Sequence, residues 1–267
     1  FRTKIKEAKK DCYIIGENWD NSNPWLMGDQ YDAVMNYGIL FPIWNYFGTN
    51  LDQRQYTSTE FKHRINKVLT DYPKNVLRAQ YNLVDSHDTT RILEICNNDS
   101  TLVKLPYVFL FSFPGAPSLY YGGEVGLSGK HDPDNRRCMI WDKDKQDASL
   151  LTHVKTLIKL RKKHKEFKST EIEWIETNDQ EEYIIYKKGE IYFITICCVP
   201  SHTNQLATPA IWQAIEETLA LRETRGDMIC RVALAMPDHL HGLFGFPGSK
   251  PMTKVIADFK SWLAKQC

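Results

Sequence analysis

The feature that most constrains the fold is a series of short apolar segments that end in polar residues and alternate with helical segments. The apolar segments YIIGENW, DAVMNY, AQYNLVDSHDT and SLYYGGEVGL occupy residues 13–19, 32–37, 79–89 and 118–127. Apolar periodicity predicts helices over residues 39–47, 58–70, 102–113 and 147–165. This alternation is typical of a parallel sheet with buried strands. Polar residues at the strand ends are typical of a (β/α) barrel active site.

After residue 170 the pattern changes. Segment 171–196 has alternating strands and a turn signal at Lys188-Gly189, which predicts antiparallel β structure. The elements predicted beyond it are a helix over 208–226, two strand-like halves within 230–247 and an amphipathic helix over 251–266. The chain therefore divides into two regions of different architecture.

Composition excludes several classes of protein. A hydrophobic content of 42% with 25% charged residues is that of a soluble globular protein. The net charge of +1 gives no global attraction to nucleic acid. No apolar run reaches the roughly 20 residues of a membrane helix. The charged start, FRTKIKEAKKD, predicts that there is no signal peptide, and the initial Phe1 predicts a missing upstream piece.

The cysteines favour a reducing compartment. The chain has an odd number of cysteines, seven, and no CxxC pair. This argues against a disulfide framework or a zinc knuckle. We therefore expect reduced thiols and a cytoplasmic location for Cys12, Cys96, Cys138, Cys197, Cys198, Cys230 and Cys267.

A first group of candidate residues lies at the ends of the apolar segments. Glu17 ends the first segment beside Trp19, and His87 and Asp88 end the third. Taken alone, a glutamate at a strand end is more often a solvated or capping residue, and a single histidine is more often structural. A retaining glycosidase, however, uses two carboxyl groups about 5–5.5 Å apart. An adjacent aromatic ring raises the pKa of a carboxyl group by desolvation, and we expect Trp19 to act on Glu17 in this way.

The longer strings resemble the neopullulanase and cyclomaltodextrinase branch of the α-amylase family, glycoside hydrolase family 13. These strings are GDQYDAVMNY, NLVDSHDTTRIL, FSFPGAPSLYYGGEVGL and HDPDNRRCMIWD. The resemblance extends from Phe1 to about Ile196. It implies a retaining glycosidase that acts on an α-glucan oligosaccharide and needs no cofactor.

The resemblance also implies roles for individual residues. Glu17 would be the general acid/base, and Asp88 would be the carboxylate that grips sugar hydroxyls. His87 would hydrogen-bond the same sugar. Asp132 and Arg136 resemble a pair that binds the next sugar, and Trp19 would join them in substrate binding.

One signature of this family is missing from the sequence. The family's nucleophilic aspartate lies on the fourth barrel strand, in a string like GWRLDVAN, and no such string occurs here. The resemblance therefore implies strands five to eight of the barrel over 1–168 and the start of the C-terminal β domain over 169–196. A half barrel has unpaired edges. We expect a truncated enzyme, inactive alone, whose partner is a missing N-terminal half or a second copy of the chain.

A second group of candidate residues lies in MPDHLHGLF, which contains His239 and His241. Alternate residues of a strand share a face, so both imidazoles can hold one metal ion. A bare HxH is more often a pair of surface or core histidines. With YFITICC before it and FKSWLAKQ after it, the string resembles the REP-associated, single-tyrosine HUH transposases over 191–267. This implies an α+β, ferredoxin-like fragment.

The transposase resemblance implies Mg²⁺ or Mn²⁺ at the histidine pair and single-stranded DNA as a partner. The family's tyrosine lies on a later helix that has no counterpart here, and Tyr192 is not a match because it lies in the first strand. Residues 197–267 contain seven basic and six acidic side chains, which is no strong electrostatic footprint for DNA. We therefore expect no strand cleavage.

Both resemblances include IYFITI, so a junction is predicted within 191–198. It would arise from a transposon insertion, a gene fusion or an assembly error. The first hypothesis is a truncated α-glucan hydrolase fused to a truncated HUH domain. The alternatives are a DNA-binding or single-strand-nicking protein with an amylase-like remnant, and a non-catalytic glucan-binding remnant.

Overall fold

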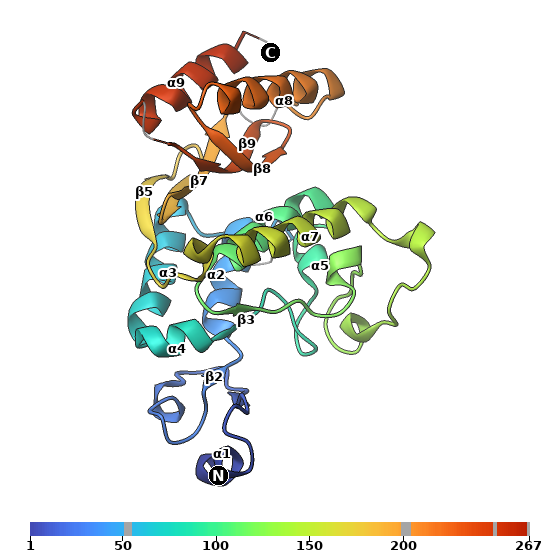
Figure 1. Cartoon of the computed structure of the whole chain (residues 1–267). Helices are drawn as coiled ribbons and strands as arrows, with labels where there is room; N and C mark the ends of the chain where they lie inside the picture. Colours follow the sequence, from blue (N-terminus) through green and yellow to red (C-terminus); the bar gives the residue numbers. More distant parts are fainter. Residues whose placement is uncertain (51–54, 199–203, 248–249, 266–267) are drawn as a thin grey trace. The chain divides into compact units, whose positions relative to one another are not determined.

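The computed structural model describes residues 1–50, 55–198, 204–247 and 250–265. The chain forms two compact units, Phe1–Thr170 and Glu171–Cys267. Figure 1 shows the helices and strands of each. Strands from the predicted segments 169–196 and 191–267 share one sheet in the second unit. The domain boundaries inferred from the sequence stay predictions.

The first unit contains very short parallel strands. In chain order they are β1 (Ile15–Gly16), β2 (Ala33–Val34), β3 (Tyr81–Asn82) and β4 (Ala116–Pro117). Strand β1 pairs with β2, and β3 pairs with β4. An isolated parallel bridge between Met35 and Tyr81 connects the two pairs. The predicted parallel arrangement is confirmed, although each paired segment is shorter than its apolar run.

Helices of the first unit follow the predicted periodicity. The main helices are α1 (Arg2–Ala8), α2 (Tyr37–Phe47), α3 (Ser58–Asp71), α4 (Lys74–Ala79), α5 (Ile92–Ile95), α6 (Ser100–Ser112) and α7 (Ala148–Lys163). Short 3-10 helices η1 to η5 cover Asn23–Trp25, Gly123–Val125, Asp134–Arg136, Lys143–Lys145 and Lys165–Lys168. Phe47, Phe61 and Phe109 pack together from α2, α3 and α6, with ring centroids 5.1–6.2 Å apart. These rings form a buried aromatic core between the helices.

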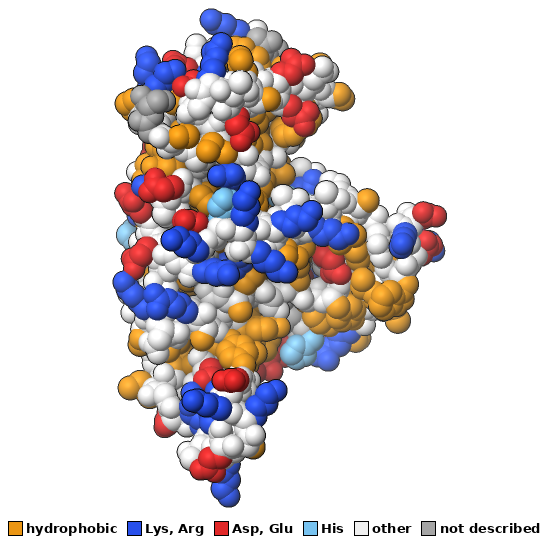
Figure 2. Space-filling model, viewed as in Figure 1, with side chains coloured by type: hydrophobic (Ala, Val, Ile, Leu, Met, Phe, Trp, Pro, Cys, Tyr) orange, Lys and Arg blue, Asp and Glu red, His pale blue; other side chains and the backbone are white. Residues whose placement is uncertain are grey.

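Local signals explain where two of these helices begin and end. Thr57 and Glu60 form a capping box at the start of α3, which satisfies two free backbone N–H groups. The Asp147 side chain accepts a hydrogen bond from the Leu150 N–H at the start of α7. Basic side chains lie over α7 in Figure 2, and its last turn contains Arg161, Lys162 and Lys163. Positive charge there stabilises the carbonyl end of the helix dipole.

The fourth predicted strand, at 118–127, is wrong. The paired residues are Ala116 and Pro117, and residues 121–126 form turns and η2 instead. Gly122 and Gly126 have φ values of 80° and 83°. These left-handed conformations suit glycine and cannot continue a strand. An added Cβ at Gly122 would lie 2.7 Å from a Leu127 methyl carbon, so this turn has no room for a side chain.

The second unit is one antiparallel sheet with two helices. Its strands lie in the order β5-β6-β7-β9-β8. The elements are β5 (Glu173–Asn178), β6 (Tyr183–Lys188), β7 (Ile191–Cys197), α8 (Pro209–Thr224), β8 (Ile229–Ala235), β9 (His239–Gly245) and α9 (Met252–Leu263). The predicted order of strands and helices is confirmed. Both helices lie on one side of the sheet in Figure 1.

The core of the second unit identifies the covered face. Leu240 and Phe244 of β9 belong to one buried cluster with Ile215 of α8 and Val255 and Phe259 of α9. Since side chains alternate along a strand, His239, His241 and Leu243 point to the other face. The helices therefore pack against the face opposite the histidines.

Candidate active site

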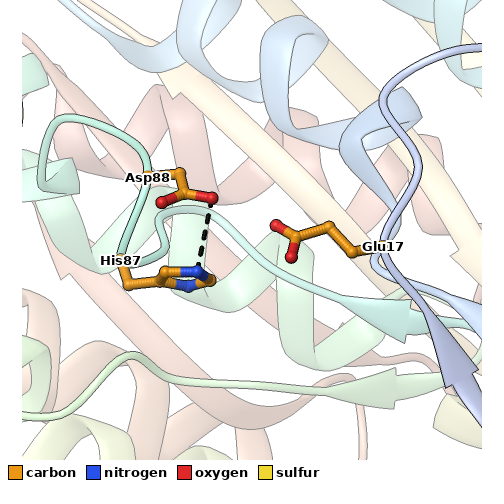
Figure 3. Close-up of side chains that lie close together, drawn as sticks. All are labelled: Glu17, His87 and Asp88. Carbon is orange, nitrogen blue, oxygen red and sulfur yellow. Dashed lines mark ion pairs between the residues drawn. The ribbon is translucent and has the colours of Figure 1, made fainter.

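Three predicted site residues converge at the strand ends of the first unit (Figure 3). Glu17 follows β1, and His87 and Asp88 lie in the loop after β3. One ligand atom from each residue can be chosen so that all three lie within 4.8 Å of one another. Strand β2 lies between β1 and β3, so the site spans three strands rather than two adjacent ones. The predicted clustering of these side chains is confirmed.

Glu17 contacts Tyr37, an aromatic residue that the sequence suggested for sugar stacking but not as a partner of this carboxylate. The Tyr37 hydroxyl donates a hydrogen bond to Glu17 Oε1 at 3.1 Å and lies 3.4 Å from Ser86 Oγ. Burial raises the pKa of Tyr37 to about 12, and the charges of Glu17 and Asp88 add to this rise. Tyr37 therefore stays a protonated donor at neutral pH and orients the Glu17 carboxylate.

Trp19 is connected to the site by its contact with Tyr37. Its ring stacks on the Tyr37 ring, with centroids 3.7 Å apart and planes 11° apart. Both residues also line a cavity of about 370 Å³, with Asn36 and Tyr72 on its wall. Trp19 is 47% exposed, so the outer face of its ring is open to solvent. Such a face is available for stacking against a ligand.

Arg136 joins the site as the sequence argument expected. Its Nη2 lies 3.0 Å from Asp88 Oδ1, and its Nε lies 2.7 Å from Asp132 Oδ1. On the other side of Asp88, Oδ2 lies 3.3 Å from His87 Nε2. Asp88 therefore faces a guanidinium and an imidazole at once, which is an arrangement that holds a carboxylate in one orientation.

Asn135 holds the loop that carries His87 and Asp88. Its Nδ2 donates to the carbonyl oxygens of His87 at 2.7 Å and Thr89 at 2.8 Å, with a longer contact of 3.4 Å to that of Ser86. The Asn135 side chain is fully buried. Asn135 was not predicted from the sequence as a site residue, although it lies next to Arg136 in the string HDPDNRRCMIWD. No spacing rule connects one asparagine to a loop 46 to 49 residues away.

The buried carboxyl group of Asp85 and the buried guanidinium of Arg91 support the same loop. Asp85 Oδ2 accepts a hydrogen bond from the Ile92 N–H at 3.0 Å, and burial raises the pKa of Asp85 to about 6. Arg91 donates from Nε to the Asn135 carbonyl at 2.8 Å, and its guanidinium lies 4.1 Å from the ring centroid of Tyr120. These contacts fix both ends of the loop, which leaves His87 and Asp88 little freedom to move.

The histidine pair of the second unit lies as predicted, on one face of a central strand. The His239 and His241 ring centroids are 4.5 Å apart. His239 Nδ1 lies 2.6 Å from Asp238 Oδ1, and His241 Nδ1 lies 2.9 Å from the Thr195 hydroxyl. His241 is buried, and burial, with a further effect of His239, lowers the pKa of His241 well below its usual value. Its ring is therefore neutral at physiological pH.

The remaining predictions concern membrane helices, cysteines, and metal and DNA binding by the second unit. Within the described ranges, no helix has the length and hydrophobicity to cross a bilayer. The cysteines that the structure describes are free thiols, at Cys12, Cys96, Cys138, Cys197, Cys198 and Cys230. Cys267 lies outside the described residues. Metal binding by His239 and His241 and contact with DNA stay predictions.

Comparison with known proteins identifies the family. The model of the α-amylase catalytic domain matches residues 1–189. A cyclomaltodextrinase of Geobacillus thermopakistaniensis is 41% identical over 190 residues, which cover 71% of this chain and 32% of that protein. A maltogenic α-amylase of Bacillus acidopullulyticus is 38% identical over 221 residues, which cover 82% and 37%. The chain thus spans about a third of the length of these relatives.

Solved structures agree with this match. Ttha1563 of Thermus thermophilus is 27% identical with a TM-score of 0.73, covering 92% of this chain and 54% of that one. A cyclic α-maltosyl-(1→6)-maltose hydrolase of Arthrobacter globiformis is 29% identical with a TM-score of 0.66, covering 74% and 44%. Because the matched family model covers most of the sequence, the chain belongs to the α-amylase family.

Proposed function

We propose that this chain provides the acid/base and sugar-binding half of an α-glucan hydrolase site. The observation that carries the proposal is the convergence of Glu17, His87 and Asp88 within 4.8 Å. In the proposed reaction Glu17 protonates the leaving oxygen of the glycosidic bond. Tyr37 keeps the Glu17 carboxyl oriented through its hydrogen bond at 3.1 Å. Asp88 and His87 bind hydroxyl groups of the sugar at the cleavage point.

Asp88 is a poor candidate for the attacking carboxylate. One of its oxygens lies 3.0 Å from Arg136, and the other lies 3.3 Å from His87. Both oxygens are therefore turned towards partners that suit sugar binding. A retaining glycosidase needs a second carboxylate to form the glycosyl intermediate. We propose that this nucleophile comes from a barrel segment outside the 267 residues and that the present chain does not hydrolyse glucans alone.

The proposed substrate is a linear or cyclic maltooligosaccharide. Relatives named cyclomaltodextrinase and maltogenic α-amylase support this class. Trp19 and Tyr37 also line a neighbouring cavity of about 370 Å³, which is within the usual range for small-molecule sites but is not lined by Glu17, His87 or Asp88. Its aromatic wall suits the apolar face of a sugar ring, while Asp132 and Arg136 supply polar contacts for a neighbouring sugar.

We also propose a cytoplasmic location. A relative from Bacillus subtilis that is 34% identical over 250 residues is named an intracellular maltogenic amylase. The free thiols of the described cysteines are consistent with a reducing compartment. Fractionation of the source cells with an antibody against the chain tests the location.

Complementation tests the enzymatic proposal. The purified chain is mixed with the N-terminal barrel half of the Geobacillus cyclomaltodextrinase, and hydrolysis of β-cyclodextrin is measured. We expect turnover from the mixture and none from either part. Turnover by the chain alone that disappears in Glu17→Gln would show that it contains its own nucleophile. Binding of maltotriose to the single chain, followed by NMR titration, checks the sugar-binding part separately.

A second candidate function concerns the second unit. Both imidazoles use Nδ1 for a hydrogen bond, His239 with Asp238 and His241 with Thr195. Among the described residues, the buried His241 Nε2 has no hydrogen-bond partner. An Nδ1 that is fixed by an oxygen partner, with Nε2 left free, is the usual arrangement of metal-binding histidines. These observations support the proposal of an HUH-derived unit in which His239 and His241 hold Mg²⁺ or Mn²⁺.

In that proposal the ion polarises a phosphate of single-stranded DNA. Two neutral nitrogen ligands hold such a hard ion weakly, because it prefers oxygen. We therefore expect weak DNA binding that depends on Mn²⁺, without cleavage. The assay uses a single-stranded hairpin DNA and compares the chain with the His239→Ala/His241→Ala double variant. A covalent protein–DNA adduct would show that the unit is catalytically complete.

A further inference from the structure

We propose that Glu17, His87 and Asp88 form a Zn²⁺ site that competes with sugar for the same side chains. Zinc binding itself follows from the geometry of these residues, whereas its inhibitory consequence rests on the proposed hydrolase function. The three residues are the one group of this kind among the described residues, with ligand atoms within 4.8 Å of one another. Figure 3 shows Glu17 pointing towards the other two side chains.

The spacing of the donor atoms matches a four-coordinate metal. Zinc binds nitrogen and oxygen at about 2.0–2.2 Å in a tetrahedron, which places its ligand atoms roughly 3.4 Å apart. His87 Nε2 and Asp88 Oδ2 already lie 3.3 Å apart. The Glu17 carboxylate is exposed, lies on a long side chain and is within 4.8 Å of the other two ligand atoms, so we expect rotation of this side chain to complete the site.

Hydrogen bonds around the site occupy one oxygen of each carboxylate. Tyr37 uses Glu17 Oε1, and Arg136 uses Asp88 Oδ1. The second oxygen of Asp88 faces His87 Nε2 at 3.3 Å, so an ion bound by both residues would replace that contact. Outer hydrogen bonds such as those of Tyr37 and Arg136 orient metal ligands and strengthen binding.

The donor set selects the metal. One imidazole and two carboxylates supply nitrogen and oxygen donors of the kinds that zinc binds, and they leave a fourth position open to water. Mg²⁺ and Ca²⁺ prefer shells made of six or more oxygens, so they should bind much more weakly. The two negative charges balance a divalent ion, and the ion pair of Arg136 with Asp132 partly neutralises the nearby guanidinium. The pair His239 and His241 lacks two carboxylates and makes a weaker site.

Isothermal titration of the whole chain with Zn²⁺ tests the proposal. We expect binding of about one equivalent that weakens about tenfold or more in His87→Ala and in Glu17→Gln. His63→Ala, at an exposed histidine of α3, is the matched control and should keep this binding, while the His239→Ala/His241→Ala double variant tests whether the second unit takes up the zinc instead. Mg²⁺ at the same concentration should give no comparable signal. Circular dichroism checks that each variant is folded.

Competition with maltotriose then separates the two proposals. If both proposals hold, excess maltotriose weakens the apparent Zn²⁺ affinity. Zinc binding that depends on His87 and Glu17 without any effect of maltotriose would support the metal site and contradict the sugar-binding function. Zinc binding that is unchanged in His87→Ala and in Glu17→Gln would overturn the metal site. Zinc binding that is lost only in the His239→Ala/His241→Ala double variant would overturn it too.

Discussion

The two histidine sites of this chain differ in the structure that supports them. In the first unit, His87 lies in a loop after a two-residue strand, and buried polar side chains such as Asn135 hold that loop. In the second unit, His239 and His241 lie on the seven-residue strand β9, whose neighbours β7 and β8 fix it through backbone pairing. The first site is exposed and rich in charge, while His241 is buried and neutral.

This difference shows two ways to fix a functional group. A loop needs side-chain anchors, because its backbone has no regular pairing partner. A central strand needs no such side-chain anchors, because backbone pairing with both neighbouring strands holds it. The same neighbours, together with the side chains on both faces of the sheet, restrict the access of a ligand to it. The first arrangement suits a large flexible ligand such as an oligosaccharide. The second arrangement suits a small ion or a purely structural role.

The largest expected effect separates the chemistry of the two sites. In the complemented enzyme, Glu17→Gln should lower kcat for β-cyclodextrin by about 10²–10⁴-fold, because general acid–base catalysis contributes that much. His239→Ala should leave kcat within about twofold. Steady-state kinetics with equal amounts of folded protein measures both. A similar loss in both variants would mean that the two sites are not functionally separate.

Removing one buried aromatic ring from the core of either unit should lower the free energy of unfolding. Phe109 and Phe259 are both almost completely buried, in the first and second unit. Phe109→Ala and Phe259→Ala should each lower the free energy of unfolding by about 3–5 kcal/mol. Hydrogen exchange should locate the loss of protection in the unit that carries the change. The control is Leu221→Ala, because Leu221 is 48% exposed and should cost less than about 0.5 kcal/mol.

Buried titratable groups should give the two units opposite responses to pH. Burial raises the pKa of Asp85 from 3.8 to about 6, so the folded first unit resists ionisation of this carboxyl group. Its favourable contribution is complete below the unfolded value and is lost as pH rises through about 6, which amounts to roughly 3 kcal/mol. Asp85→Asn should therefore flatten the fall in stability between pH 4 and about 6. Urea unfolding at several pH values measures this slope.

His241 should show the reverse sign. Its pKa in the folded state lies well below 6.5, so below that pH the unfolded chain takes up a proton that the folded chain refuses. The second unit therefore loses stability as pH falls from about 6.5. His241→Phe should reduce this acid sensitivity, as measured by hydrogen exchange of β9. An unchanged slope would contradict the inference that His241 is buried and neutral.

The smallest expected effect concerns the anchor of the loop. Asn135→Ala removes the donor that serves the His87 and Thr89 carbonyls, so the free energy of unfolding should fall by about 1–3 kcal/mol. Zn²⁺ and maltotriose affinities should fall with it, because His87 and Asp88 lose their fixed position. Asn204→Ala, which removes a hydrogen bond of an exposed side chain, is the control. Unchanged affinities for Zn²⁺ and maltotriose in folded Asn135→Ala would show that the loop keeps its conformation without Asn135.

Long elements could be predicted from the sequence, and short ones could not. The helices over 58–70 and 147–165 were located to within about two residues, since apolar periodicity and capping residues such as Asp147 act locally. The strand predicted at 118–127 failed because φ at Gly122 and Gly126 depends on the turn into which they fold. Predicted strands exceeded the observed pairs, because an apolar run indicates burial and does not specify which backbone groups pair.

The sequence by itself determined the α-amylase family, the order of helices and strands, and the three residues that converge at the first site. Recurring strings and short-range periodicity carry that information. Tertiary structure alone decided that Tyr37 contacts Glu17, that Trp19 stacks on Tyr37 and that Asn135 anchors the loop of His87. These contacts join side chains about 20 to nearly 50 residues apart, and packing of the whole unit selects them. No local pattern specifies which distant hydroxyl or amide reaches a given oxygen.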